Sequence, residues 1–154
     1  MPLSKGSTYD NAYFDYLLNP LKNIFKDEFS SSSVYISPNM QNNGNFEIAI
    51  WGSIATTEDL RQQGWSKRYN ATISMYLKEP NPNEAFYELL YLRAERAYQL
   101  LYNNSTKSTT VGSVTMTWTS GETSEFIINE IEDDESEIDG LNKISLDFSC
   151  LIER

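Results

Sequence analysis

The chain has 154 residues, of which 40% are hydrophobic and 13% aromatic, which is enough apolar material for one folded domain and too much for a disordered chain. Its 22 acidic and 12 basic residues give a formal net charge of -10, which disfavours direct binding to nucleic acid or to an anionic membrane. One cysteine, Cys150, and no histidine exclude disulfide scaffolds, Ser-His-Asp triads and histidine-containing zinc sites. No run is apolar enough for a membrane span and the first ten residues do not resemble a secretion signal, so we expect a soluble protein.

The chain from Asp10 to Phe29 predicts an amphipathic helix, because apolar residues recur there at steps of three and four. These residues are Tyr13, Phe14, Leu17, Leu18, Leu21, Ile24 and Phe25. Pro20 interrupts the pattern, and it allows two interpretations. Either the helix kinks there, or Asn19 caps a second helix that has Pro20 at its first position.

A long antiparallel hairpin is predicted next. Residues 34–38 form a short strand that ends at Pro38, and residues 46–57 alternate apolar and polar side chains with the period of a half-buried strand. Residues 68–79 resume the alternation, with Tyr69, Ala71, Ile73, Met75 and Leu77 on one face. Between them, the polar stretch EDLRQQGWSKR indicates a long loop or a hairpin extension. We therefore expect one domain over residues 1–154 with a hairpin extension around residues 52–68.

Residues 84–104 give the best helix signal in the chain. Pro80 and Pro82 end the preceding strand, and Asn83 suits a helix cap. A helix of about twenty residues should lie across a sheet. Its expected packing side consists of Phe86, Leu89, Leu90, Arg93, Ala94, Ala97, Leu100 and Leu101.

The last third of the chain reads mainly as strands. Residues 105–110 are expected to be a loop, and residues 111–119, 124–131 and 143–152 are expected to be strands, with turns at 120–124 and at Gly140. Taken with the earlier elements, this order predicts an α+β domain: a mixed, mostly antiparallel sheet, with the long helix and the N-terminal helix packed on one face.

An acidic stretch separates the last two predicted strands. Its carboxylates are Glu130, Glu132, Asp133, Asp134, Glu135, Glu137 and Asp139. Their spacing does not match a helix-loop-helix calcium site, and a charge run in a loop is usually just solvated. Four of them, Asp133, Asp134, Glu135 and Glu137, could still chelate a divalent cation loosely. A third interpretation is that the loop creates a negative field that repels a polyanion.

We find no sequence motif that supports catalysis. The chain has no GxSxG nucleophile elbow and no phosphate-binding GxxxxGK[ST] or GxGxxG motif. No pair of carboxylates is singled out for acid and base roles, so we expect no enzymatic activity and no cofactor.

Trp65 is conspicuous because it follows Gly64 within the polar extension, where a core residue is not expected. Tryptophan is enriched at protein interfaces, so Trp65 either contacts a partner or forms a local hydrophobic cluster. Arg61, Lys67 and Arg68 surround it and could pair with acidic residues on a neighbouring copy.

These elements together resemble the tail terminator proteins of long-tailed bacteriophages. The resemblance covers nearly the whole chain in element order, size and acidity. It comprises the N-terminal helix, the hairpin FEIAIWGSIATTEDLRQQGWSKRYNATISMYLKE with its polar extension, one long helix, and a strand-rich end that closes on LDFSCLIER. No short motif contributes to it.

The resemblance implies a structural virion protein. Such proteins form a hexameric ring on the head-proximal end of the tail tube, stop tube growth, and provide the surface where the head and neck dock. The implied partners are further copies of the chain, the tail tube protein and a head-tail connector or neck protein, with DNA passing through the bore without specific binding. The implied location is the tail or neck of the virion, after assembly in the host cytoplasm.

Within this picture the charged segments receive hypothetical roles. Residues Glu130 to Asp139 would face the bore or its rim, while Arg61, Trp65, Lys67 and Arg68 would contact a neighbouring subunit or the tube. The two could also be exchanged, with the acidic loop meeting the basic patch at the subunit boundary. Alternative functions are another phage neck, tail-completion or baseplate adaptor protein and, further behind, a metal-dependent carboxylate hydrolase.

Overall fold

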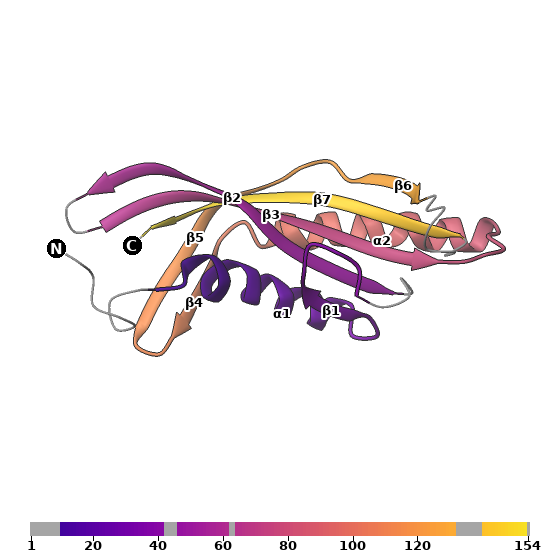
Figure 1. Ribbon diagram of the computed structural model, residues 1–154, viewed down its shortest axis with the longest axis horizontal. Coiled ribbons are helices and arrows are strands. Elements are labelled where there is room, and N and C mark those ends of the chain that lie inside the picture. Colours follow the sequence, from indigo (N-terminus) through magenta and orange to yellow (C-terminus); the bar gives the residue numbers. More distant parts are fainter. Residues whose placement is uncertain (1–9, 42–45, 62–63, 132–139, 154) are drawn as a thin grey trace.

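The computed structural model describes residues 10–41, 46–61, 64–131 and 140–153. In the described part, seven strands form one mixed sheet and the helical segments pack against it, which confirms the predicted α+β class (Figure 1). The helical segments are η1 (Phe14–Leu18), α1 (Asn19–Glu28) and α2 (Glu84–Asn103). The strands are β1 (Ser33–Ile36), β2 (Glu47–Arg61), β3 (Gly64–Lys78), β4 (Lys107–Val111), β5 (Val114–Thr123), β6 (Ile127–Ile131) and β7 (Leu141–Glu153).

Three long strands, β2, β3 and β7, form the centre of the sheet. The strand order is β1-β2-β3-β7-β5-β4, and only the β1–β2 pair is parallel. One edge of β7 pairs with β3 along its whole length. The other edge is shared, because β6 pairs with residues 141–145 and β5 pairs with residues 148–152. The strands β2 and β3 have 15 residues each, so the predicted polar extension is a continuation of the hairpin rather than a loop.

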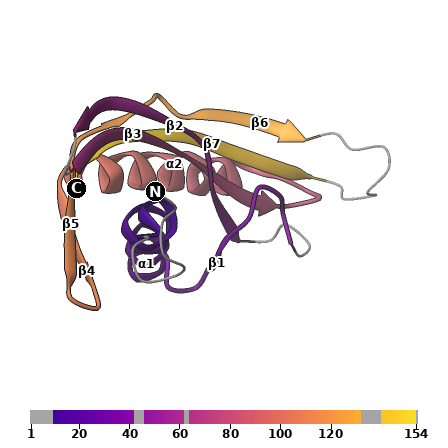
Figure 2. The ribbon, with the colours of Figure 1, turned by 60° about the vertical axis from the view of Figure 1, so that its left-hand side comes forward.

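The helices lie on one face of the sheet, and the core lies between them and the sheet (Figure 2). The predicted apolar face of β3 is buried from Tyr69 to Leu77, and β7 contributes a matching row of buried side chains. That row is Ile144, Leu146, Phe148, Cys150 and Ile152. The period-two signal therefore identified the inner face of both strands correctly.

The helix α2 begins where the sequence indicates. The side chain of Asn83 accepts a hydrogen bond of 3.0 Å from the backbone N–H of Phe86, which satisfies one of the donors left open at a helix start. Its buried residues are Leu90, Ala94, Ala97 and Leu101, all from the predicted packing side.

Pro20 does not end the first helix. Leu18 and Asn19 both have helical backbone angles and no side chain caps at this point, so the interpretation with an Asn19 cap is wrong. The helix widens instead into one π-helical segment, in which the N–H of Asn19 bonds to the carbonyl of Phe14 five residues earlier. Since proline has no N–H to donate and crowds the preceding turn, the wider turn lets the chain remain helical through Pro20.

Two predicted connections are strands in the structure. Residues 107–110, expected to be part of a loop, belong to β4 together with Val111, because hydroxyl pairs join this strand to β5: Ser108 with Thr117 at 2.6 Å and Thr110 with Thr115 at 2.7 Å. The turn expected at 120–124 is an irregularity inside β5, where the register shifts and Ser120 has a φ of 53°. The turn at Gly140 is confirmed.

Candidate interaction surfaces

The distal part of the β2–β3 hairpin, residues 52–61 and 64–70, extends beyond the helical body and is termed the arm (Figure 1). A bulge interrupts β2 at its base, where the register against β3 shifts between Gly52 and Ala55. The hydroxyl of Tyr13, from the start of the helical segment, lies at this bulge. It accepts a hydrogen bond of 3.1 Å from the N–H of Ile54, and its single O–H can donate to the carbonyl of either Ile54 or Asn70. One side chain therefore joins both strands of the arm to the body.

The environment of Tyr13 is partly apolar. Its ring packs edge-on against Tyr69 with the ring centroids 4.9 Å apart. Burial raises the pKa of Tyr13, although its hydrogen bonds to the backbone act in the opposite direction. Tyr13 therefore stays protonated at neutral pH, and its hydroxyl can both donate and accept.

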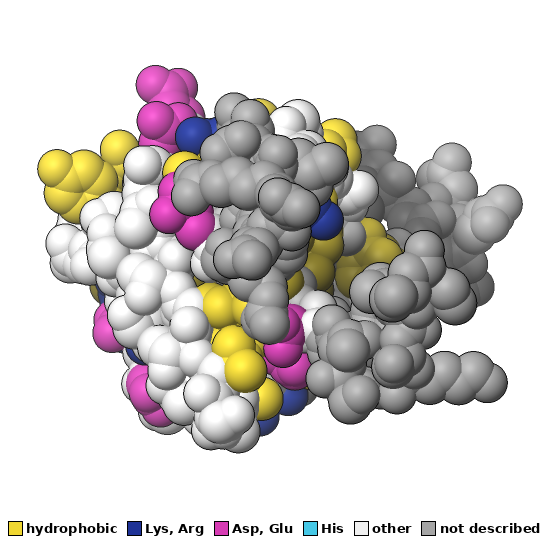
Figure 3. Space-filling view, turned by 90° about the vertical axis from the view of Figure 1, so that its left-hand side faces the viewer, with side chains coloured by type: hydrophobic (Ala, Val, Ile, Leu, Met, Phe, Trp, Pro, Cys, Tyr) yellow, Lys and Arg dark blue, Asp and Glu magenta, His cyan; other side chains and the backbone are white. Residues whose placement is uncertain are grey.

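Large apolar side chains are exposed near the base of the arm. Trp51 is 43% exposed and Ile54 is 55% exposed. Figure 3 views the molecule from the end where the arm lies, and hydrophobic side chains reach the surface there in small groups, with charged side chains beside some of them. Large apolar side chains that are exposed in this way are candidates for a contact surface.

Two of the four residues predicted for the arm interface, Lys67 and Arg68, lie on opposite faces of β3. Tyr69 faces the helices, and alternation along β3 therefore places Lys67 on the helix side and Arg68 on the opposite, open face. Arg68 donates a hydrogen bond of 3.3 Å from Nη1 to Oγ of Ser149 on β7. Arg61 and Trp65 belong to the paired strands near the tip, and their side chains lie outside the described residues.

The acidic stretch falls almost wholly outside the described residues. Glu130 belongs to β6, where its backbone pairs with Asn142, while its side chain and the segment with Glu132, Asp133, Asp134, Glu135, Glu137 and Asp139 are not described. The two strands that flank this segment, β6 and β7, meet at the end of the sheet opposite the arm (Figure 1). The segment and the arm are thus anchored at different ends of the molecule.

The helix α2 carries a second exposed apolar surface. Tyr87, Tyr91, Tyr98 and Tyr102 follow one another at steps of four, seven and four residues, which places them on one side of the helix. Three of them are 43%, 56% and 70% exposed in the order Tyr87, Tyr91, Tyr102. We term these four residues the tyrosine face. In the sequence, these tyrosines repeat with the period of a helix, offset from the repeat of the buried residues.

An open cavity of about 440 Å³ adjoins the tyrosine face. Glu95 and Tyr98 of α2 line it together with Glu125 and Phe126, which precede β6. Carboxylates therefore lie beside the aromatic rings, so the exposed side of α2 is both aromatic and acidic.

The described part of the chain shows no arrangement typical of a catalytic or metal centre. Within it, no group of three or more Asp, Glu, Cys or His side chains is placed to hold a metal ion. Burial raises the pKa of the Cys150 thiol to about 12, so it is not a reactive thiolate at neutral pH. Among these residues, none of the helices has both the length and the apolar composition needed to cross a bilayer.

In its described part, the chain is a mixed-sheet α+β protein that exposes apolar side chains at the base of the arm and on α2. No protein-family model matches the chain, and no curated protein matches it significantly.

Proposed function

We propose that the protein is a tail terminator subunit, which forms a ring, hexameric in this family, at the head-proximal end of a phage tail tube. The ring stops tube growth and provides the docking surface for the head or neck. The resemblance in element order supports this proposal, and one structural observation carries it: the chain exposes two unlike apolar surfaces, one at the base of the arm and one on α2.

Two unlike surfaces are what a closed ring requires. In a ring, each copy presents one surface to the preceding copy and a different surface to the next, whereas a two-fold dimer uses the same surface twice. The base of the arm contributes Trp51 and Ile54, and α2 contributes the tyrosine face beside Glu95. Aromatic residues are favoured at the centres of such contacts because each buries a large area.

The first experiment measures the mass of the purified chain in solution by light scattering, with and without millimolar magnesium to screen its acids. We expect a hexamer, or a monomer that closes into a hexamer in magnesium or on tail tubes. A chain that stays monomeric and does not bind tail tubes contradicts the proposal. A different oligomer number, or binding to a head connector but not to the tube, would instead favour a neck, tail-completion or baseplate adaptor protein.

Two variants test whether the contact is head-to-tail. Trp51→Ser with Ile54→Ser removes the arm surface, and Tyr91→Ser with Tyr102→Ser removes the tyrosine face. Each variant alone should be monomeric, and an equimolar mixture should form dimers but no ring, since one intact surface of each kind remains. Ile127→Ser, at a residue that is 59% exposed on β6, is the control and should leave the ring intact.

The acidic stretch is tested separately by reversing the charges of Glu132, Asp133 and Asp134. If these residues line the bore, the ring persists and DNA retention or ejection changes. If they meet a basic patch on the neighbouring copy, the ring is lost. A tightly and stoichiometrically bound metal ion that these residues hold would favour the hydrolase alternative.

A further inference from the structure

An aromatic and acidic cavity lies between α2 and the segment that precedes β6. Its described lining consists of Glu95 and Tyr98 on α2, and of Glu125 and Phe126 on the second wall. Its volume of about 440 Å³ falls within the range of about 300 to 1,000 Å³ that is usual for ligand sites in proteins. The cavity is open, so a small molecule or a side chain of another protein can enter it.

The second wall is fixed to the sheet by a pair of reciprocal hydrogen bonds. The N–H of Ser124 donates to the carbonyl of Asp147 at 2.9 Å, and the N–H of Asp147 donates to Oγ of Ser124 at 2.9 Å. These bonds hold the chain directly before Glu125. The rings of Tyr98 and Phe126 are half-buried and pack against the core. Both walls are therefore in place before a ligand arrives, which lowers the entropy cost of binding.

The carboxylates of the cavity have no basic partner within the described residues. Neither Glu95 nor Glu125 accepts a hydrogen bond there or forms an ion pair with its carboxylate. Arg96, which follows Glu95 in the chain, points to the other side of α2 and binds Glu28 of α1 at 2.9 Å. The cavity therefore keeps a local negative charge, which attracts a cation.

The rings indicate which kind of cation fits. An aromatic ring attracts a cation through the negative charge of its face, and its apolar surface covers an aliphatic stem such as that of a lysine side chain. A carboxylate supplies the opposite charge for the head of the same group. An alkylammonium group has both parts, and it meets both kinds of wall in this cavity.

A metal ion fits the same lining less well. Magnesium and calcium ions require about six to eight oxygen ligands close to the metal. Within the described part of the chain, no group of three or more Asp, Glu, Cys or His side chains is placed to hold such an ion. The two carboxylates of the cavity come from separate elements and share it with two rings, so the cavity favours an organic cation.

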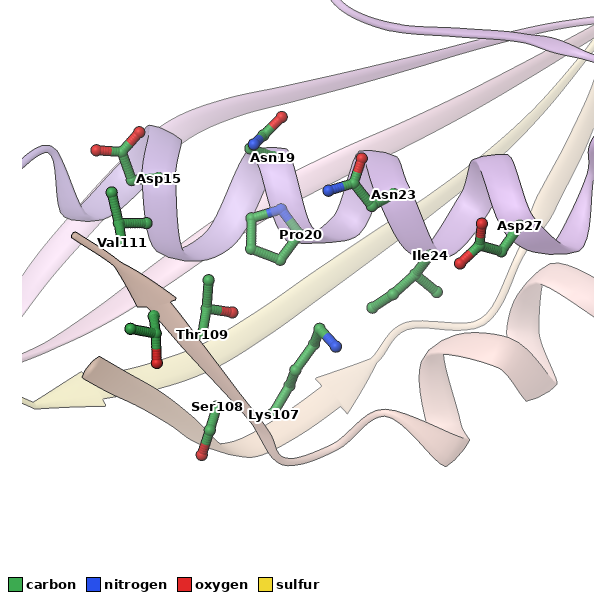
Figure 4. Close-up of a pocket in the computed structure, with 11 residues that line it drawn as sticks. Asp15, Asn19, Pro20, Asn23, Ile24, Asp27, Lys107, Ser108, Thr109 and Val111 are labelled. Carbon is green, nitrogen blue, oxygen red and sulfur yellow. The ribbon is translucent and has the colours of Figure 1, made fainter. Parts of the chain in front are cut away.

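A polar groove elsewhere in the molecule provides a comparison (Figure 4). It lies between the first helical segment and β4, and it has a similar volume of about 430 Å³. Asp15 and Asp27 contribute its carboxylates, but Lys107 also lines it and offsets part of their charge. Among its described lining residues there is no aromatic side chain. The groove thus offers acids without rings, and its acids serve as matched controls.

We propose that the cavity between α2 and β6 binds a primary alkylammonium group, whose nitrogen lies beside Glu95 and Glu125 and whose stem lies against Tyr98 and Phe126. Such a group is carried by a lysine side chain of a partner protein or by a free polyamine. Tyr98 also belongs to the tyrosine face, so the site lies at the border of the proposed ring contact. Binding itself does not require a ring.

The test titrates the full chain with n-butylammonium chloride at constant ionic strength and follows the ring NMR signals of Tyr98 and Phe126. Ammonium chloride carries the charge without the stem, and 1-butanol carries the stem without the charge. We expect saturable shifts with butylammonium and about five-fold or weaker binding of each comparison compound. The same titration of the variant Trp51→Ser with Ile54→Ser, which lacks the arm surface, keeps the result separate from ring formation.

Two variants show whether the acids of the cavity are responsible. Glu95→Gln with Glu125→Gln keeps the size of both side chains and should weaken butylammonium binding about five-fold or more. Asp15→Asn with Asp27→Asn, in the polar groove, removes the same charge and should leave binding unchanged. Absence of saturable shifts at millimolar concentrations, equal binding of 1-butanol, or an equal loss in the control variant would overturn the proposal.

Two further probes distinguish the sources of the alkylammonium group. A lysine blocked at both ends as the acetyl and methylamide derivative presents the peptide groups of a partner protein, whereas spermidine is a free polyamine. Blocked lysine that binds at least as tightly as spermidine assigns the site to a side chain of a partner. An advantage of spermidine that is lost in Glu95→Gln with Glu125→Gln assigns it to a polyamine. If both probes bind equally well to this variant and to the original chain, the proposal fails.

Discussion

The ring of Tyr13 occupies the place where a side chain on residue 52 would stand. A Cβ atom added to Gly52 would lie 2.1 Å from Cε1 of Tyr13. The absence of a side chain on Gly52 therefore lets the helix lie against β2, and lets the hydroxyl of Tyr13 reach both strands of the arm.

Gly52→Ala should destabilise the protein by about 1 to 3 kcal/mol, because the ring of Tyr13 has to move and its hydrogen bonds are disturbed. Urea unfolding measures the change. In a Tyr13→Ala background the same substitution should be neutral or slightly stabilising, since alanine is favoured over glycine within a strand by about 0.5 to 1 kcal/mol. Equal losses of stability in both backgrounds would show that the ring of Tyr13 is not what excludes a side chain at residue 52.

Tyr13→Phe keeps the ring and removes only the hydroxyl. The N–H of Ile54 then loses its partner at the bulge, and we expect a loss of about 1 to 2 kcal/mol. Hydrogen exchange of the Ile54 amide should become faster. Exchange at core positions of β3, such as Ile73, should change only by the amount that the lower free energy of unfolding predicts. Unchanged exchange at Ile54 would mean that the hydroxyl does not hold the bulge.

Arg96 joins the two helices. It forms hydrogen bonds of 3.2 and 2.9 Å to a carboxylate oxygen of Glu28 and one of 3.1 Å to its carbonyl, and it lies 4.8 Å from the ring centre of Phe29. Since 40% of its side chain is exposed, Arg96→Lys should cost only about 0.5 to 1 kcal/mol. Lys26→Arg, on an exposed part of α1, is the control and should change nothing; a similar loss there would mean that the contacts of Arg96 are not the cause.

Stability should fall at alkaline pH. Burial raises the pKa of Cys150 from 9.0 to about 12 and that of Tyr69 from 10.0 to about 12. The folded protein then holds protons that the unfolded chain releases, so the free energy of unfolding decreases as the pH rises from about 9 toward 12. In Cys150→Ala the decrease between pH 9 and 10 should be shallower, measured by urea unfolding at each pH. An unchanged slope would mean that the thiol does not contribute.

The hydrophobic core was predictable from the sequence because its signal is local and periodic. Alternation from Tyr69 to Leu77 identified the inner face of β3, and the same rule identified β7. The strand β4 escaped this rule, since an edge strand that hydroxyl pairs such as Ser108 with Thr117 join to its neighbour needs no apolar alternation. A run of serine and threonine looks the same in a loop and in such a strand.

The candidate surfaces were less predictable. The apolar residues of α2 obey two overlapping periods: the first placed Leu90 on the packing side correctly, but the second does not by itself show that Tyr91 is left exposed. The polar groove combines residues 15–27 with residues 107–111, and nothing in either segment indicates the other. The contact of Tyr13 with Gly52 depends in the same way on a fold that brings distant residues together.

The shared pairing of β7 bears on how the chain is made. During synthesis on the ribosome, β3, β5 and β6 all emerge before their common neighbour, and each keeps an unpaired edge until residues 141–153 have left the exit tunnel. Unpaired edges of nascent chains can join with one another. A polypeptide released before Leu141 would therefore expose three incomplete edges at once, so premature termination should yield aggregates rather than a smaller folded subunit.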